Sequence, residues 1–198
     1  RIPIEAGGNR TEERTNVGSE RFKRVIQNIF TSGTFDKYRD DIDVYLKFLM
    51  VNAIGIVAGF FLLGYGILDM IRGIHPVGEV ITAAGAVVVI NLIFLRVTEN
   101  HKVASWVAAF VLTAGFMFLL STGGGGNTGP LWLYTFPGAA MILLGIRAGS
   151  VLFFGLVLYI AVALFIPDSP LLFTDYPSDF VIRFIPTLLT VLVMVYIF

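Results

Sequence analysis

Six long apolar runs, separated by short polar or glycine-rich breaks, limit most strongly what this chain can fold into. The runs cover 45–68, 77–97, 102–121, 131–146, 148–166 and 180–198. A helix that crosses the hydrocarbon core of a bilayer needs about 20 predominantly apolar residues. The runs do not alternate polar and apolar residues, which argues against a membrane β-barrel. The sequence therefore predicts an all-α membrane protein, a six-transmembrane-helix bundle.

The composition supports a membrane location and excludes several functions. Hydrophobic residues make up 56% of the 198 residues and charged residues 14%, against about 25% charged residues in an average soluble domain. The formal net charge is zero, so the chain lacks the basic footprint of a nucleic-acid-binding protein. It has no Cys, which excludes disulfides, thiolate nucleophiles and Cys-based metal sites. We expect no cofactor, no metal and no nucleic-acid partner.

The first 43 residues differ from the rest because they are polar and carry mixed charge. Residues 1–20 have few large apolar side chains and predict a flexible cytoplasmic tail. Residues 21–43 form a juxtamembrane segment that precedes the transmembrane domain, 44–198. In this segment one helical face collects Phe22, Val25, Ile26, Ile29 and Phe30. A cytoplasmic amphipathic helix lying in the membrane interface is the main interpretation, and a soluble helix that packs on a partner domain is the alternative.

The fourth and fifth runs leave two arrangements open. They are separated only by Arg147 and its neighbours, so they are either two membrane spans or one broken re-entrant hairpin. Pro137 and Pro186 lie inside the fourth and sixth runs. Because proline removes a backbone donor, we expect both residues to kink their helices.

The distribution of basic residues predicts the orientation in the membrane. With the N-terminus inside, most basic residues flank the membrane on the cytoplasmic side, as the positive-inside rule requires. The inner bases after the N-terminal tail are Lys47, Arg96, Lys102 and Arg147, and the outer ones are Arg72 and Arg183. We expect a multi-pass membrane protein with both termini in the cytoplasm.

Ionisable and aromatic residues at the predicted outer face form a candidate ligand pocket. Its members are Asp69, Glu79, Trp132, Tyr134, Asp179 and Arg183. Ionisable groups near helix ends are costly inside a bundle and often bind ligands. Arg183 most needs a partner, and Asp179 and Glu79 are the candidates. The alternative is that the charged groups reach water and the aromatic residues form an ordinary interfacial belt.

The glycine-rich outer loop 121–130 is not a nucleotide site, because a P-loop requires a following Gly-Lys-Ser/Thr. It is either a flexible connection or a loop whose bare backbone approaches a ligand. Gly55, Gly59, Gly64 and Gly66 form a second glycine pattern, which predicts close helix packing within the chain.

Nothing in the sequence supports catalysis. The two His residues, at 75 and 101, fall on opposite sides of the predicted membrane, and no HExxH or GxSxG motif occurs. The last run ends at Phe198 without a polar flank, and the chain begins with Arg1. We therefore expect a non-enzymatic part of a longer polypeptide, whose sixth helix continues toward a cytoplasmic domain.

Three stretches carry a resemblance to a known family. They are TGPLWLYTFP (Thr128–Pro137) with LLGIRAG (Leu143–Gly149), and YPSDFVIRFIPTLLTVLVMVYIF (Tyr176–Phe198). With the basic juxtamembrane entry, they resemble the six-helix N-terminal sensor domains of bacterial signalling proteins. Such domains precede GGDEF diguanylate cyclases, histidine kinases and class III adenylyl cyclases. The resemblance implies a location in the bacterial inner membrane, sensing of an outer-face or intramembrane ligand, and dimeric output through the sixth helix.

Three functions are consistent with these patterns. The main hypothesis is a receptor domain that binds an unknown small ligand and relays the signal to a cytoplasmic output. This domain would be a homodimer surrounded by membrane lipids. A small transporter or channel subunit would instead need a polar path across the bundle. A structural subunit of a larger membrane complex would need only lateral helix packing.

Overall fold

The structure is a computed structural model that describes residues 25–26, 28–33, 37, 41–166 and 169–197. Every regular element within these residues is a helix, which confirms the predicted all-α class. The elements are α2 (Ile42–Ile71), α3 (His75–Thr98), α4 (His101–Thr122), η1 (Gly125–Asn127), η2 (Gly129–Thr135), α5 (Phe136–Leu144), α6 (Ile146–Phe165) and α7 (Ser178–Ile197).

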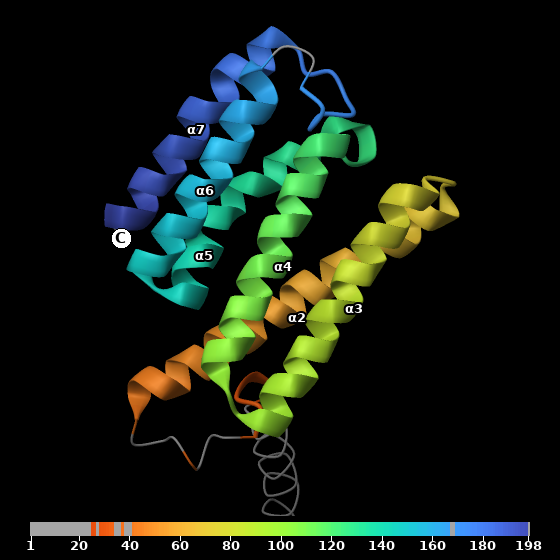
Figure 1. The fold of residues 1–198 in the computed structure, drawn as a ribbon. Helices are drawn as coiled ribbons and strands as arrows, with labels where there is room; N and C mark the ends of the chain where they lie inside the picture. Colours follow the sequence, from red (N-terminus) through yellow and green to blue (C-terminus); the bar gives the residue numbers. More distant parts are fainter. Residues whose placement is uncertain (1–24, 27, 34–36, 38–40, 167–168, 198) are drawn as a thin grey trace, which may run out of the picture.

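Five of these helices, α2, α3, α4, α6 and α7, are long and apolar enough to cross a membrane. With η2 and α5 taken together as one segment, successive long segments run in opposite directions along the bundle (Figure 1). As a result, the start of α2 and the end of α7 lie at the same end, here called the terminal end, with the α3–α4 and α5–α6 turns. The opposite end, the loop end, holds the α2–α3 turn, the glycine-rich loop and the α6–α7 loop.

The fourth apolar run is not the single α-helix that its composition predicts. Its first part, η2, is a 3-10 helix, and α5 follows with 9 residues. Proline explains the change of helix type. Pro137 has no N–H for the Leu133 carbonyl, and the Phe136 N–H donates to that carbonyl instead, in the 3-10 pattern. Pro137 therefore lies in the first turn of α5 and not inside a continuous helix.

Pro186, in contrast, lies inside α7 as the sequence predicts. Its ring leaves the carbonyl one turn earlier without a backbone donor. Thr190 donates a side-chain hydrogen bond of 2.9 Å to the Pro186 carbonyl and so adds a local contact in the next turn. The kink expected at Pro186 stays a prediction.

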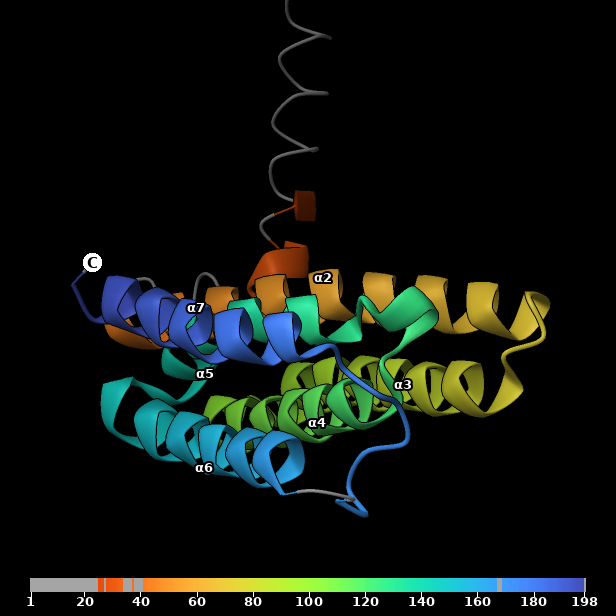
Figure 2. The same cartoon turned by 90° about the horizontal axis from the view of Figure 1, so that it is seen from above.

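A sharp turn at Gly145, which has a φ of +80°, connects α5 to α6. The two helices then pack very closely. A Cβ on Gly149 of α6 would lie 2.8 Å from the Ala140 carbonyl oxygen and 2.8 Å from the Met141 Cα atom of α5. Because α5 also packs on α7, it lies between α6 and α7 (Figure 2).

Helices α2 and α3 form a hairpin held by the predicted glycine pattern. A Cβ on Gly66 would lie 2.7 Å from the Thr82 backbone nitrogen, and one on Gly78 would lie 2.8 Å from the Gly66 carbonyl oxygen. Gly55 and Gly59 also face α3, whereas a Cβ on Gly64 would meet nothing within 4 Å. The glycines of α2 thus serve packing within the chain, with Gly64 as the exception.

The interior of the described helices is filled by two apolar clusters. One joins α4, η2, α5, α6 and α7 and includes Phe136, Phe153 and Phe184. The other joins the α2–α3 hairpin to α4 and α5 and centres on Phe48, Leu95 and Leu143. A hydrogen bond of 2.9 Å from the Asn91 amide to the Ala104 carbonyl adds a polar link between α3 and α4.

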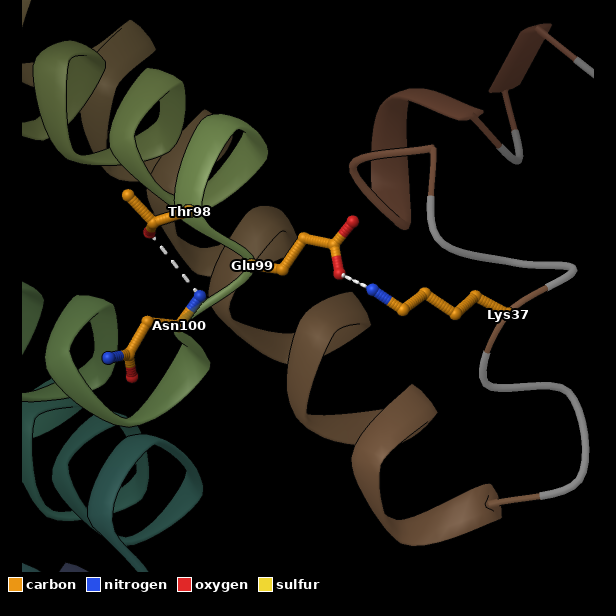
Figure 3. Close-up of polar contacts among 4 residues, drawn as sticks. All are labelled: Lys37, Thr98, Glu99 and Asn100. Carbon is orange, nitrogen blue, oxygen red and sulfur yellow. Dashed lines mark hydrogen bonds and ion pairs between the residues drawn. The ribbon is translucent and has the colours of Figure 1, made fainter.

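Part of the juxtamembrane segment contacts the terminal end of the bundle. Thr31 is fully buried, and Ser32 exchanges hydrogen bonds with the buried amide of Asn52 in α2 at 2.9 and 3.1 Å. Lys37 forms an exposed ion pair with Glu99 in the α3–α4 turn (Figure 3). Residues 25–26 and 28–30 are helical. The predicted tail 1–20, Phe22 and the rest of 21–24 lie outside the described residues.

Candidate functional site

The loop end is held together by hydrogen bonds between two connections that are far apart in the sequence. Phe173 of the α6–α7 loop donates its backbone N–H to the Ser121 carbonyl at 2.8 Å. Thr174 donates its hydroxyl to the Asn127 side-chain oxygen in the glycine-rich loop at 3.2 Å. The Tyr176 hydroxyl donates to the Leu120 carbonyl at 2.5 Å. The α6–α7 loop is therefore fixed across the end of α4.

Burial raises the pKa of Tyr176 from the ordinary 10.0 to about 12. The neutral phenol is the form that donates to Leu120, so its contribution to stability is complete below pH 10 and is lost as the pH rises toward 12. We expect Tyr176→Phe to cost about 1 kcal/mol below that range. Ultraviolet absorbance of the wild type and of Tyr176→Phe is recorded as the pH is raised. The difference between the two titrations should show one phenol that ionises with a midpoint near 12. A midpoint at the ordinary value would contradict this expectation.

Asp69, in the last turn of α2, is the most unusual residue at this end. Its exposed fraction is only 6%, yet no hydrogen bond or ion pair from the described residues reaches its carboxylate. Arg72 follows three residues later and is exposed, without an ion pair to Asp69. Among the described residues only Ser105 Oγ is completely buried without a hydrogen bond, so the Asp69 carboxylate keeps a narrow contact with solvent. A carboxylate with little exposure and no protein partner is a candidate group for binding a ligand.

The Asp69 carboxylate points at the glycine-rich loop. A Cβ placed on Gly125 would lie 3.8 Å from Asp69 Oδ1. The loop requires glycine for its own conformation, because Gly123 and Gly124 have φ values of +76° and +62°. A Cβ on Gly129 would also lie 2.8 Å from the Gly123 carbonyl oxygen. The glycine stretch 123–125 of this loop thus lies beside Asp69.

Two aromatic residues share the face of α2 that carries Asp69. Phe61, Tyr65 and Asp69 follow one another at intervals of one helical turn. The ring centroid of Trp132 in η2 lies 5.7 Å from that of Phe61 and 6.1 Å from that of Tyr65. This face of α2 therefore meets both η1, through Gly125, and η2, through Trp132. We call Asp69, Gly125, Phe61, Tyr65 and Trp132 the loop-end site.

The structure brings only two of the six sequence-predicted residues, Asp69 and Trp132, to this site. Tyr134 lies on η2 but faces α7, where its ring centroid is 5.3 Å from that of Phe184. Glu79, Asp179 and Arg183 are exposed, and within the described part of the chain no ion pair joins Arg183 to either acid.

Sequence reasoning missed two of the other members of the loop-end site and anticipated the third only in outline. Phe61 and Tyr65 look like ordinary lipid-facing residues within an apolar run. Their spacing from Asp69 was the available signal, because residues four apart share a helix face. The role of Gly125 was foreseen only in outline, as a loop whose bare backbone approaches a ligand.

A separate groove between α4 and α6 has a volume of about 380 Å³. Its lining is apolar apart from Thr113, whose hydroxyl donates to the Ala109 carbonyl of its own helix at 2.7 Å. Such a groove on a membrane protein can hold hydrocarbon but offers no group for chemistry.

Comparison of the chain with protein-family models, with curated proteins and with solved structures finds no match. The functional conclusions below therefore depend on the geometry of the chain itself.

Proposed function

We propose that this chain is a six-pass membrane receptor domain, in which the loop-end site receives a signal and α7 carries it to the terminal end. One observation supports the proposal above all: η2 contacts both the α2 side of the loop-end site and α7. Its Trp132 ring packs on Phe61 and Tyr65 beside Asp69, and its Tyr134 ring packs on Phe184 of α7. A change at the site therefore has a short physical route to α7.

The helix type of η2 suits this role. It continues in the 3-10 form for 7 residues, although such runs seldom exceed three or four residues. Because 3-10 hydrogen bonds have poorer geometry than α-helical ones, such a segment rearranges at lower cost and often marks a hinge. In the proposed mechanism, ligand binding displaces Trp132, η2 moves as a lever, and Tyr134 shifts α7.

The proposed six passes include Gly129–Leu144 as the fourth. A segment of seven 3-10 and nine α-helical residues reaches about 27 Å, close to the hydrocarbon thickness of about 30 Å. The bases Lys47, Arg96, Lys102 and Arg147 then lie near the terminal end, and Arg72 and Arg183 lie toward the loop end. By the positive-inside rule, the terminal end faces the cytoplasm. The family resemblance suggests that the membrane is a bacterial inner membrane.

The absence of native cysteine makes this topology testable by labelling with a membrane-impermeant maleimide. We expect Ile74→Cys and Asp175→Cys to react in intact cells, and Lys102→Cys and Arg147→Cys to react only after permeabilisation. These four positions are exposed. A re-entrant Gly129–Leu144 would invert the result at positions 147 and 175 alone, which would show that the chain crosses the membrane in fewer passes.

Helix α7 is suited to output because one face alone holds it in the bundle. Phe184, Leu188 and Leu192 are its buried residues and share that face. The opposite face, with Val193 and Ile197 exposed, is free to meet membrane lipids or a second copy. We propose a homodimer that uses this outer face and an output domain of the cyclase or kinase type beyond α7.

The relay proposal predicts that a change at Asp69 moves α7. We expect Asp69→Asn to shift the distance between spin labels on Phe110→Cys in α4 and Met194→Cys in α7 by about 1–2 Å. Both label positions are more than half exposed, so labelling should not disturb the core. Pulsed electron paramagnetic resonance in nanodiscs measures this distance.

Two further variants show whether the shift follows the proposed route. Glu79→Gln neutralises another loop-end carboxylate, which is exposed, and should leave the distance unchanged. Trp132→Ala removes the contact with α2 and should abolish the response to Asp69→Asn. Identical distance distributions in the wild type and in Asp69→Asn would refute the relay.

The apolar interior favours a receptor over a transporter. A transport path needs polar groups that line a continuous route, whereas most buried apolar residues of the described helices gather into two clusters. The buried amides Asn52 and Asn91 hydrogen-bond to a neighbouring hydroxyl or carbonyl. These hydrogen bonds satisfy the polar groups of both amides within the protein interior.

A further inference from the structure

We infer that the loop-end site binds an organic ammonium group, of the kind carried by ethanolamine. This inference rests on the proposed function only in placing the site at the outer membrane face. The ammonium group has two sources with the same chemistry, a phosphatidylethanolamine headgroup and a free soluble amine.

The charge of the ligand follows from Asp69. The residue is 6% exposed, its carboxylate keeps some contact with solvent but has no partner among the described residues, and Oδ1 lies toward the Gly125 backbone. A carboxylate in this state is best satisfied by a cationic donor, because charge-assisted hydrogen bonds are stronger than neutral ones. An ammonium group supplies both the positive charge and N–H donors.

The organic character of the ligand follows from the aromatic residues. Tyr65 lies one turn before Asp69, and Trp132 packs against Tyr65. Both rings remain partly exposed, at 46% for Tyr65 and 40% for Trp132, so they keep free surface for a ligand. Aromatic faces attract organic cations through cation–π interactions, and Trp does so most strongly.

A bare metal ion fits this site less well. Ca²⁺ needs six to eight oxygen ligands and Mg²⁺ an octahedral set. Within the described residues, no three His, Cys, Asp or Glu side chains come together to hold a metal ion. One carboxylate beside two aromatic rings matches an amine instead.

Arg72 bears on the source of the amine. It follows Asp69 by three residues and is exposed beyond the end of α2. An ethanolamine headgroup carries a phosphate next to its ammonium group, and a guanidinium is well suited to bind that phosphate. A lipid headgroup would therefore use Asp69 and Arg72 together, whereas a free amine would use Asp69 alone.

Fluorescence of Trp132 tests the inference directly. The chain has two Trp residues, so Trp106→Phe leaves Trp132 as the only indole. The full chain is placed in phosphatidylglycerol nanodiscs and titrated with ethanolamine, and separately in nanodiscs that contain phosphatidylethanolamine. NaCl and MgCl₂ at equal ionic strength are the controls.

We expect a saturable change in Trp132 emission in at least one arm, and Asp69→Asn should weaken it about tenfold or more. A response to soluble ethanolamine identifies a free amine. A response only to the lipid, weakened by Arg72→Gln, identifies the headgroup. A response to NaCl or MgCl₂ equal to that for the amine would overturn the inference, as would no response in either arm.

Failure of this inference is distinguishable from failure of the proposed function. If no amine binds but Asp69→Asn still moves α7, the relay stands with a ligand of another class. If an amine binds but α7 does not move, the site is real and the relay proposal fails.

Discussion

Gly149→Ala should destabilise the chain by about 1–3 kcal/mol, although Ala is the better helix former. A Cβ at this position would meet backbone atoms of α5, 2.8 Å from the Ala140 carbonyl oxygen and 2.8 Å from the Met141 Cα atom. Backbone atoms cannot rotate away as a side chain can, so α5 and α6 must separate. The loss is measured as a lower midpoint of thermal unfolding in detergent, with size-exclusion chromatography as the readout.

Gly155→Ala is the matched control because it lies on the same helix, where a Cβ would meet nothing within 4 Å. This variant should be neutral or more stable by up to about 1 kcal/mol, through the helix propensity of Ala. Equal midpoints for the two variants would mean that α5 and α6 do not pack as closely as the structure shows.

The positions of the helices follow closely from the sequence. The first apolar run, 45–68, lies inside α2, and the second, 77–97, lies inside α3. Hydrophobicity indicates only the part of a helix that lipid can cover, so the apolar runs are shorter than the helices. The polar start of α2 lies outside the run, and there the Asp41 side chain caps the helix by accepting a hydrogen bond of 3.2 Å from the Val44 N–H.

The helix type of the fourth run could not be predicted from hydrophobicity. Leu131 and Trp132 are as apolar as residues of any membrane helix, yet they belong to a 3-10 segment. The deciding groups are local, a Pro130 at the start of that segment and a Pro137 without an N–H at its end. The sequence pattern predicts a kink at Pro137, whereas the structure places this residue in the first turn of a new helix.

Burial separates the candidate site residues in a way that charge does not. Asp69 and Asp179 look equivalent in the sequence, since both lie near the loop end of a long helix. The structure buries Asp69 against the glycine-rich loop and exposes Asp179 on α7. The difference depends on which elements pack beside each residue, and this tertiary information has no signature in local composition.

Gly66→Ala should weaken the hairpin and disturb the loop-end site together. A Cβ on Gly66 would lie 2.7 Å from the Thr82 backbone nitrogen and 3.0 Å from the Gly78 carbonyl oxygen of α3. The clash lies one turn before Asp69, so the helices must separate near the position that sets the carboxylate against Gly125. We expect a loss of about 1–3 kcal/mol in thermal unfolding.

The same substitution should also change the emission of Trp132 in a Trp106→Phe background, because Trp132 packs on Tyr65, the residue before Gly66. Gly64→Ala separates this effect from a general effect of Ala on α2, since a Cβ there would meet nothing within 4 Å. That variant should keep the wild-type emission and the wild-type stability or better. If Gly66→Ala loses stability while Trp132 emission stays unchanged, the hairpin and the loop-end site are independent, and the route from Asp69 to η2 cannot depend on close packing of α2 and α3.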